Sequence, residues 1–327
     1  MNFQRPLPLR PHFSIRPWGG NRLSETLGKE LPPGGPYGES WELSDHPDGR
    51  SLVGGSEFAG TTFGELARSN PRELLGRDEA PAKFPLLVKY IDAAGDLSVQ
   101  VHPDDVWCEA NAHDDRGKSE CWYVMDCAPG AKVVYGYKKG VTEAQARRAL
   151  AEGGYTDLLE FLPIAPGDFI AIPPRTVHAM LAGTLVCEIQ QSSNTTFRLY
   201  DWDRQPPREL HIDKGMSTTE WERALLPRIK SLGPIKREMR AEYLLRNPHF
   251  SVFLFELPPG GMVEIDRPES EGEILNAVAG DGAIEAAGHT DALRLGDTWF
   301  LPAHLREATI VAGPRGLRVL ITSNNEL

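Results

Sequence analysis

Alternating apolar and polar positions recur in short runs along the chain and predict a protein built mainly from β-strands. An apolar run covers 84–91, and the run at 97–102 alternates strictly between apolar and polar residues. Alternate side chains of a strand lie on opposite faces, so the apolar members of the second run would pack into a core. Its polar members, Ser98, Gln100 and His102, would share the other face. Pro103 has no backbone N–H to donate, so this strand should end there.

Similar patterns, bounded by glycine and proline, continue on both sides of these runs. Further strands are expected over 13–15, 39–43, 51–53, 119–127, 131–137, 169–172, 177–181, 185–190 and 195–200, and again between 245 and 325. Helices are expected over 61–76, 104–112 and 142–150, and a helical piece at 220–226 within a charged linker at 204–240. The run 16–20 is interpreted as a tight turn. The fold class is therefore mainly β, with small helical insertions.

A seven-residue pattern occurs twice in the chain. The segments 167–173 and 296–302 each hold a turn, a short apolar strand and a proline. This repeat predicts two similar β-barrels or jelly rolls. Counting on from each repeated glycine places Glu307 of the second copy opposite His178 of the first. The C-terminal barrel is therefore expected to bind no metal.

Length and charge narrow the possible organisation and partners. A chain of 327 residues exceeds what one core usually serves, which indicates two domains or one domain with a large insertion. With two domains, we expect one over 1–235 and a second over 236–327. A formal net charge of −11 argues against nucleic acid or an anionic membrane as partner. No apolar run reaches membrane-spanning length, and prolines interrupt the N-terminus where a signal peptide would be apolar. A cytoplasmic protein is expected, either monomer or homodimer.

The polar row of the strand at 97–102 is costly to bury unless something binds to it. A metal ion is the candidate, because imidazole and amide groups both offer lone pairs. Two further residues near predicted strand ends extend the pattern, which then comprises Gln100, His102, Glu120 and His178. Two neutral imidazoles, one amide and one carboxylate leave a divalent ion with a net charge near +1, which suits a Lewis acid. Such ligands favour Zn²⁺, with Fe²⁺, Mn²⁺ and Co²⁺ as alternatives.

Four segments resemble a known family in their order and spacing. They are Ser98-Val99-Gln100-Val101-His102-Pro103, Lys118-Ser119-Glu120, the run 173–178 and the run 190–201. They resemble the type I mannose-6-phosphate isomerases, zinc-dependent cupin enzymes, in their shorter bacterial form. The resemblance implies that one zinc ion binds to Gln100, His102, Glu120 and His178. It also implies a sugar-phosphate site lined by Ser98, Lys89, Lys118 and Arg198, with Glu188, Lys118 and Arg198 in catalytic roles.

The charged residues outside the ligand set allow two interpretations. In an acidic chain, Lys89, Lys118 and Arg198 placed around a metal would attract an anion such as a phosphate. The alternative is that each is a solvated surface charge. Glu188 lies between apolar residues of a predicted strand. It is either an inward carboxylate whose pKa is raised by burial, as suits a base, or a strand-edge carboxylate paired with an arginine.

The expected activity is the reversible isomerisation of mannose 6-phosphate and fructose 6-phosphate through a cis-enediol intermediate. Its only expected partner is this small sugar phosphate. One alternative is another metal-dependent cupin, either a glucose-6-phosphate isomerase or an Fe²⁺ dioxygenase. Those enzymes commonly present His-x-His where this chain has Gln100-Val101-His102. The other alternative is a non-catalytic sugar-phosphate sensor with the same fold.

Overall fold

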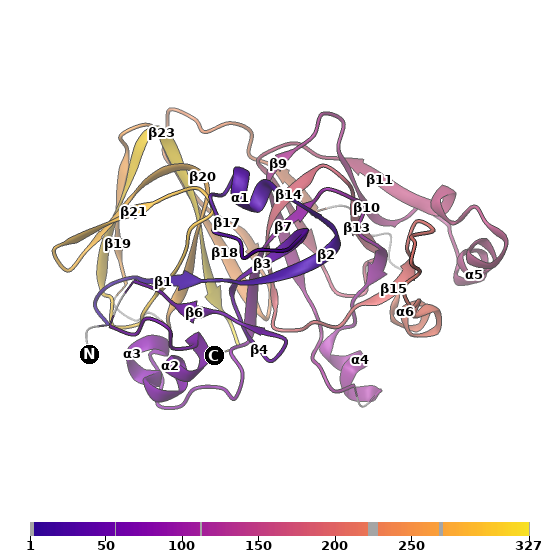
Figure 1. Cartoon of the computed structure of the whole chain (residues 1–327), viewed down its shortest axis with the longest axis horizontal. Helices are drawn as coiled ribbons and strands as arrows, with labels where there is room; N and C mark the ends of the chain where they lie inside the picture. The colour runs from indigo at the N-terminus through magenta and orange to yellow at the C-terminus, as the bar shows by residue number, and fades with distance from the viewer. Residues whose placement is uncertain (1–2, 56, 112, 222–227, 268–270, 327) are drawn as a thin grey trace.

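The computed structural model describes residues 3–55, 57–111, 113–221, 228–267 and 271–326. Most of its elements are strands, which form two barrel-like halves that lie side by side (Figure 1). We call these the N-terminal half, drawn mostly in purple and pink, and the C-terminal half, drawn in orange and yellow. Helices are short and lie around the strands. The prediction of mainly β barrels with small helical insertions is confirmed.

Two antiparallel sheets make up the N-terminal half. One has seven strands in the order β16-β12-β9-β14-β7-β3-β2, and the other has five in the order β11-β10-β13-β8-β15. The strands of the first are β2 (His12–Gly20), β3 (Tyr37–Leu43), β7 (Leu86–Ala93), β9 (Glu120–Cys127), β12 (Asp168–Ile172), β14 (Thr184–Gln191) and β16 (Arg228–Ser231). Those of the second are β8 (Val99–Val101), β10 (Lys132–Tyr137), β11 (Leu159–Pro163), β13 (His178–Met180) and β15 (Phe197–Tyr200). A buried apolar cluster joins the two sheets.

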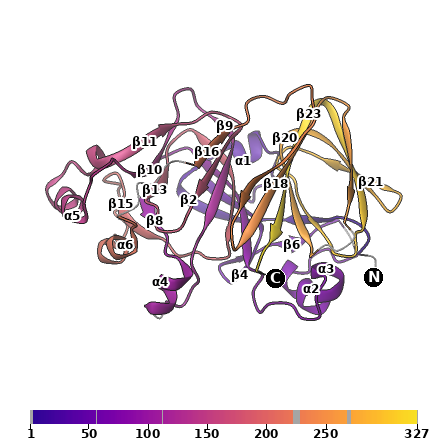
Figure 2. The same ribbon diagram turned by 180° about the vertical axis from the view of Figure 1, so that it is seen from behind.

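Helices cover the outer side of the five-stranded sheet (Figure 2). Val99 and Val101 of β8 pack in one buried cluster with Ala146 of α5 and Met216 of α6. The apolar face predicted for this strand is therefore covered by helices, and its polar face is left to point into the barrel. The helices are α1 (Arg22–Glu25), α2 (Phe63–Ser69), α3 (Pro71–Leu75), α4 (Asp105–Ala110), α5 (Glu143–Glu152), η1 (Tyr155–Leu158) and α6 (Ile212–Thr218). None of the described helices combines the length and apolar character needed to cross a membrane.

The C-terminal half contains a nine-stranded sheet in the order β17-β18-β23-β20-β22-β1-β6, with β19 beside β23 and β21 beside β20. Its strands are β1 (Leu7–Arg10), β6 (Leu52–Val53), β17 (Arg240–Arg246), β18 (Phe250–Leu257), β19 (Met262–Asp266), β20 (Glu273–Ala286), β21 (His289–Leu293), β22 (Thr298–Leu301) and β23 (Glu307–Asn324). A separate pair consists of β4 (Asp45–His46) and β5 (Gly49–Arg50). Strand β1 precedes every strand of the N-terminal half and β6 lies between β3 and β7 in the chain, yet both join this sheet. The domain boundary near residue 235 stays a prediction.

The two halves share one continuous apolar core. Tyr123 of the N-terminal half belongs to the same buried cluster as Phe250 and Phe300 of the C-terminal half. At the edge of this cluster the buried Arg318 donates a hydrogen bond of 2.7 Å to the Tyr123 hydroxyl and pairs with Glu256. Removing one partner of such a buried pair is strongly destabilising, because the other charge is left without compensation. The C-terminal half therefore supports the sheet that carries the candidate site.

Several local predictions differ from the structure. The run 16–20 is the second part of β2, which shifts register against β3 between Ile15 and Gly20. The helix predicted over 61–76 is two helices, because Asn70 ends α2 and Pro71, which lacks an N–H, begins α3. Strand β11 is absent from the prediction. The helical piece predicted at 220–226 falls mostly on residues outside the described part of the chain.

Candidate active site

Strand pairing brings the predicted metal ligands to one point inside the N-terminal half. His178, the first residue of β13, lies directly opposite Gln100 of β8. His102 follows β8 at the point where Pro103 ends the strand, as predicted. The Arg175 N–H donates to the His102 carbonyl at 2.7 Å, and the positive φ of 68° at Arg175 turns the chain into β13. The turn therefore holds the two histidine segments side by side.

The ligand side chains meet as a buried group of donor atoms. His102, Glu120 and His178 are each about 1% exposed, and one ligand atom of each lies within 4.8 Å of the others. Nε2 of His102 lies 3.6 Å from Glu120 Oε2, and Nε2 of His178 lies 3.3 Å from Glu120 Oε1. The Gln100 amide nitrogen lies 3.4 Å from both Nε2 atoms. Rotating this amide by 180° exchanges its nitrogen and oxygen, so the oxygen can face the two Nε2 atoms instead.

Backbone carbonyls orient both histidines. His102 Nδ1 lies 2.7 Å from the Thr195 carbonyl oxygen, and His178 Nδ1 lies 2.9 Å from that of Thr176. A carbonyl can only accept, so each Nδ1 carries the proton and each Nε2 presents a lone pair. Glu120 Oε1 is buried and accepts no hydrogen bond from any described residue. Acceptor atoms therefore converge on one point. The Lys118 ammonium lies 3.2 Å from His102 Nε2, but Glu120 Oε1 keeps no donor among the described residues, so the group still favours a further cation. These residues fit a divalent metal ion.

The protonation states also suit metal binding. Burial, with Lys118 and His178 close by, lowers the pKa of His102 well below its usual value, and burial lowers the pKa of His178. Burial alone would raise the pKa of Glu120, but Lys118 and His178 lower it. Two neutral imidazoles and one ionised carboxylate are the forms that coordinate metals. The Lys118 ammonium lies 2.6 Å from Glu120 Oε2, so a cationic side chain stands beside the ligand group.

Glu188 faces the barrel interior from the middle of the seven-stranded sheet. It lies opposite Lys89 on β7 and opposite Trp122 on β9. Trp122 Nε1 donates to Glu188 Oε2 at 2.9 Å, and Oε1 lies 3.4 Å from Lys89 Nζ and 3.8 Å from Lys118 Nζ. The inward interpretation is therefore correct, although its charged partners are lysines and not an arginine. Burial raises the pKa of Glu188 above its usual value, with the two lysines opposing this effect.

A cavity of about 480 Å³ opens beside the ligand group. Its lining includes all four residues predicted for the substrate site, Lys89, Ser98, Lys118 and Arg198, together with the predicted metal ligand Gln100 and the predicted base Glu188. Lys89, Ser98 and Lys118 are buried, whereas Arg198 is half-buried. The interpretation of the two lysines as solvated surface charges is wrong. The cavity therefore offers cations and a carboxylate next to a candidate metal centre.

Arg198 lies on β15, directly opposite Gln100 on β8. Its Nη1 donates to the Glu209 carbonyl at 2.7 Å, while its buried Nε has no hydrogen-bond partner among the described residues. Arg208 also lines the cavity and forms a bidentate pair with Asp201, with contacts of 2.6 and 2.8 Å. Two guanidinium groups at one cavity provide geometry suited to a phosphate.

Sequence reasoning missed a second carboxylate in the cavity. Glu39 is buried, pairs with both Nε and Nη2 of Arg16 at 3.0 Å and accepts from Trp41 Nε1 at 2.7 Å. Burial would raise its pKa, but Lys89 and Arg16 lower it to about 2. Trp18, from the run interpreted as a turn, also lines the cavity. The alternation within 37–43 contained the signal for an inward Glu39, but its partner Arg16 lies on another strand.

Another group of potential ligands lies at the protein surface. Asp105, His249 and Glu326 come within metal-binding distance of one another. They are only partly buried, and Arg116 already lies 2.7 Å from Glu326 and 3.7 Å from Asp105. This group is an ion-pair cluster between α4 and the C-terminal residues. Glu307, the position matched with His178 in the repeat, is exposed at the start of β23.

Facing β-sheets, a buried His₂Glu group and an adjoining cationic cavity define a metal-dependent enzyme of the cupin class. Residues 7–120 match the catalytic domain of phosphomannose isomerase type I. Curated mannose-6-phosphate isomerases from Streptococcus mutans and Bacillus subtilis are 35% and 33% identical, over 91% and 92% of this chain and 92% and 94% of their own lengths. The crystal structure of a Bacillus subtilis mannose 6-phosphate isomerase superposes with a TM-score of 0.85 at 31% identity, covering 98% of this chain and all of that one. The chain belongs to the type I phosphomannose isomerase family, which confirms the predicted resemblance.

Proposed function

We propose that this protein interconverts mannose 6-phosphate and fructose 6-phosphate, as the names of its relatives state for those proteins. The observation that carries this proposal is the buried His102–Glu120–His178 group at the edge of a cavity that also holds a carboxylate and several cations. These three elements suffice for isomerisation of a sugar phosphate by proton transfer: an electrophile for two sugar oxygens, a base for a carbon-bound proton, and a site for the phosphate.

Zinc is the metal that we propose for the site. His102, Glu120 and His178, with the amide oxygen of Gln100, would hold one ion per chain. When bound, the ion supplies the positive charge that polarises the carbonyl group and stabilises an enediolate. Two nitrogen and two oxygen donors without a thiolate also suit Fe²⁺, Mn²⁺ and Co²⁺, so elemental analysis has to identify the metal.

Glu188 is the proposed base. Its carboxylate removes the proton from C2 of the open-chain aldose and returns it to C1, while the hydroxyl proton passes from O2 to O1. Burial raises the pKa of Glu188, which brings the carboxyl closer to the value that suits proton transfer near neutral pH. Trp122 Nε1 holds one carboxylate oxygen at 2.9 Å, and the other, 3.4 Å from Lys89 Nζ, accepts no hydrogen bond from a described residue and can face the substrate.

Lysine and arginine side chains are proposed to bind the rest of the substrate. Lys118 and Lys89 lie within 4 Å of Glu188 and would stabilise the negative charge that develops on the sugar oxygens. Ser98 lines the cavity on the same face of its segment as Gln100, whose Oε1 lies 3.4 Å from the Ser98 hydroxyl, and would border the sugar. The buried, unpartnered Nε of Arg198 favours this residue as the phosphate ligand.

Three observations favour this function over its alternatives. The residue before Val101 is Gln100 and not the histidine that dioxygenases and cupin glucose-6-phosphate isomerases commonly present. The cavity contains an inward Glu188, which a sugar-phosphate sensor would not need. Relatives with isomerase names match over more than 90% of this chain.

A substrate comparison with purified protein tests the proposal. Coupled assays should detect turnover of mannose 6-phosphate and of fructose 6-phosphate. They should detect little conversion of glucose 6-phosphate or of free mannose, and an oxygen electrode should record no uptake. Faster turnover of glucose 6-phosphate would favour the other isomerase. No turnover of any of these sugars by protein loaded with zinc would favour a sensor.

A further inference from the structure

The orientation of His102 depends on a segment that belongs to no strand. His102 Nδ1 lies 2.7 Å from the carbonyl oxygen of Thr195, which falls between the end of β14 at Gln191 and the start of β15 at Phe197. No strand ladder therefore fixes this carbonyl. Its position must come from the side chains that hold the segment 193–195.

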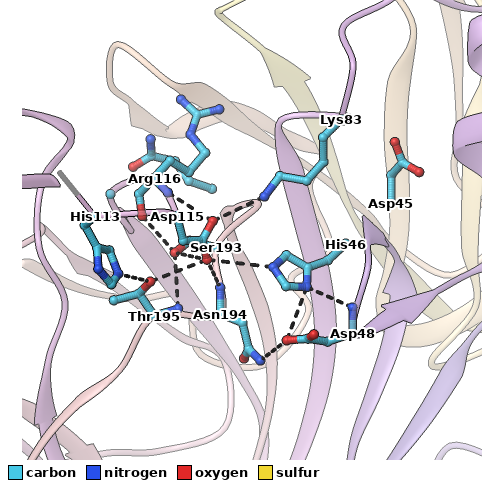
Figure 3. Close-up of polar contacts among 12 residues, drawn as sticks. Asp45, His46, Asp48, Lys83, His113, Asp115, Arg116, Ser193, Asn194 and Thr195 are labelled. Carbon is cyan, nitrogen blue, oxygen red and sulfur yellow. Dashed lines mark hydrogen bonds and ion pairs between the residues drawn. The ribbon is translucent and has the colours of Figure 1, made fainter. Parts of the chain in front are cut away.

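Asp115 holds this segment through its carboxylate (Figure 3). Asp115 Oδ2 accepts hydrogen bonds from the Asn194 N–H at 2.8 Å and from the Ser193 hydroxyl at 3.0 Å. The Thr195 hydroxyl lies 3.4 Å from the same oxygen and 2.9 Å from His113 Nε2. Ser193, Asn194 and Thr195 are thus each bound to Asp115, and Thr195 carries the carbonyl that accepts from His102.

The carboxylate of Asp115 is itself fixed from the opposite side. Lys83 Nζ lies 3.2 Å from Oδ1, and His46 Nε2 lies 3.7 Å from Oδ2. Burial would raise the pKa of Asp115, but His46, the Asn194 N–H and Lys83 hold it well below its usual range, so the group stays ionised. Hydrogen bonds to an ionised acceptor are about twice as strong as neutral ones.

The same aspartate lies in the run that leads to Glu120. The Ser193 hydroxyl shares its one proton between Asp115 Oδ2 and the Arg116 carbonyl, 2.8 Å away, so 115–116 and 193–195 are bound together. Two residues further on, Lys118 donates from its backbone N–H to the Pro103 carbonyl at 2.9 Å. Asp115 therefore joins the segment that enters the Glu120 strand to the segment that orients His102.

We propose that Asp115 is a positioning residue of the metal site, acting through the Thr195 carbonyl on the Nδ1–H of His102. This inference rests on the metal site proposed above. Outer hydrogen bonds of this kind fix the tautomer and ring orientation of a ligating histidine, and their loss typically costs 10–100-fold in metal affinity. Asp115 touches none of the donor atoms and does not itself line the cavity; it binds the backbone N–H of Asn194, which does line it, so its effect on the metal is indirect.

Zinc affinity of the Asp115→Asn variant tests this inference. Asparagine keeps the shape and one acceptor oxygen but loses the charge. Chelator competition should show zinc binding weakened about 10–100-fold. The absorption spectrum of the Co²⁺-loaded variant should differ from that of the parent, because the geometry around His102 changes. A purely structural role would move the melting temperature and leave the spectrum unchanged.

Asp45 provides a matched control. It is a buried aspartate one residue before His46, where it accepts from the Phe84 N–H at 3.1 Å and pairs with Arg68 at 2.6 Å. Its contacts do not reach 193–195 among the described residues. Asp45→Asn should lower the melting temperature and leave zinc affinity and the Co²⁺ spectrum as in the parent.

A second pair of variants keeps the inference testable if Asp115→Asn folds poorly. Thr195→Val removes the hydroxyl that binds His113 and Asp115 but keeps the carbonyl, and it should weaken zinc binding about tenfold. Thr195→Ser keeps the hydroxyl and should behave as the parent. Parent-like affinity in folded Asp115→Asn, or in Thr195→Val where Asp115→Asn does not fold, would overturn the positioning role while leaving the metal site intact. A parent protein that binds no metal would overturn the site and this inference together.

Discussion

Replacing Glu188 by glutamine separates its proposed chemical role from its structural role. Glutamine has nearly the same shape and keeps a carbonyl oxygen. This oxygen can accept from Trp122 Nε1, which lies 2.9 Å from Glu188 Oε2 in the parent protein. It cannot take up a proton near neutral pH. Lys89 loses an ion pair of 3.4 Å but keeps its contact with the Trp41 ring, 5.0 Å away. The cavity should therefore keep its form and lose its base.

The expected loss follows from the value of a positioned base. Such a group contributes about 10²–10⁴-fold to the rate, which corresponds to roughly 3–5 kcal/mol of activation free energy. We expect this loss in kcat. KM should change by no more than about threefold, because the proposed phosphate ligand Arg198 lies on a different sheet. Zinc content should be unchanged, because Glu188 is not among the ligand residues.

Steady-state assays with mannose 6-phosphate measure both constants, and Glu42→Gln serves as the control. Glu42 is a fully buried glutamate of the same sheet, paired with Lys29 at 2.7 Å and outside the cavity lining. The control should lose stability and keep kcat. Isomerisation in D₂O should also place solvent deuterium in the product of the parent enzyme. Unchanged kcat in Glu188→Gln, with zinc bound, would refute the role of this carboxylate as the base.

Three further predictions address the phosphate, the C-terminal half and pH. Arg198→Ala should lower kcat/KM for mannose 6-phosphate by an amount equivalent to about 2–3 kcal/mol of transition-state stabilisation, and free mannose should be an equally poor substrate for the variant and the parent. The same kcat/KM for mannose 6-phosphate in the variant and the parent would exclude a phosphate contact. Glu307→Ala should leave zinc content at the parent level, since its side chain is exposed; loss of a second zinc ion would contradict this. The Glu39 pKa is lowered from 4.5 to about 2, so its contribution to stability is present above about pH 4.5 and lost as pH falls towards 2. In protein treated with a chelator, the unfolding free energy should rise between pH 2 and pH 4.5, and Glu39→Gln should remove about 3 kcal/mol of this rise, as measured by denaturant titration. An unchanged rise in the variant would contradict the lowered pKa of Glu39.

Much of the candidate site could be predicted because its residues lie in local patterns. Alternation placed Gln100 and His102 on one face, and Pro103 marked the end of the strand. The resemblance then joined these residues to Glu120 and His178, which no local pattern could bring together. Strand alternation left Glu188 either inward or at an edge, and only its pairing with Lys89 and Trp122 decides between them.

Contacts between distant segments could not be predicted in this way. Asp115 binds residues that follow it by almost eighty positions, and nothing in its own segment indicates a partner. Glu39 and Arg16 meet across β3 and β2, which shift register in the run interpreted as a turn. Likewise, β1 joins the C-terminal sheet from the start of the chain. In each instance tertiary packing chooses the partner, and the residue types alone are compatible with many.

The central claim is that one metal ion on His102, Glu120 and His178 supports isomerisation of a sugar phosphate. The most direct test removes metal from the purified protein with a chelator and restores zinc in steps, while bound zinc and mannose 6-phosphate turnover are measured on the same samples. Activity should rise in proportion to bound zinc and reach its maximum at about one ion per chain, and His178→Ala should show neither. Full activity in protein shown to be free of metal would contradict the claim.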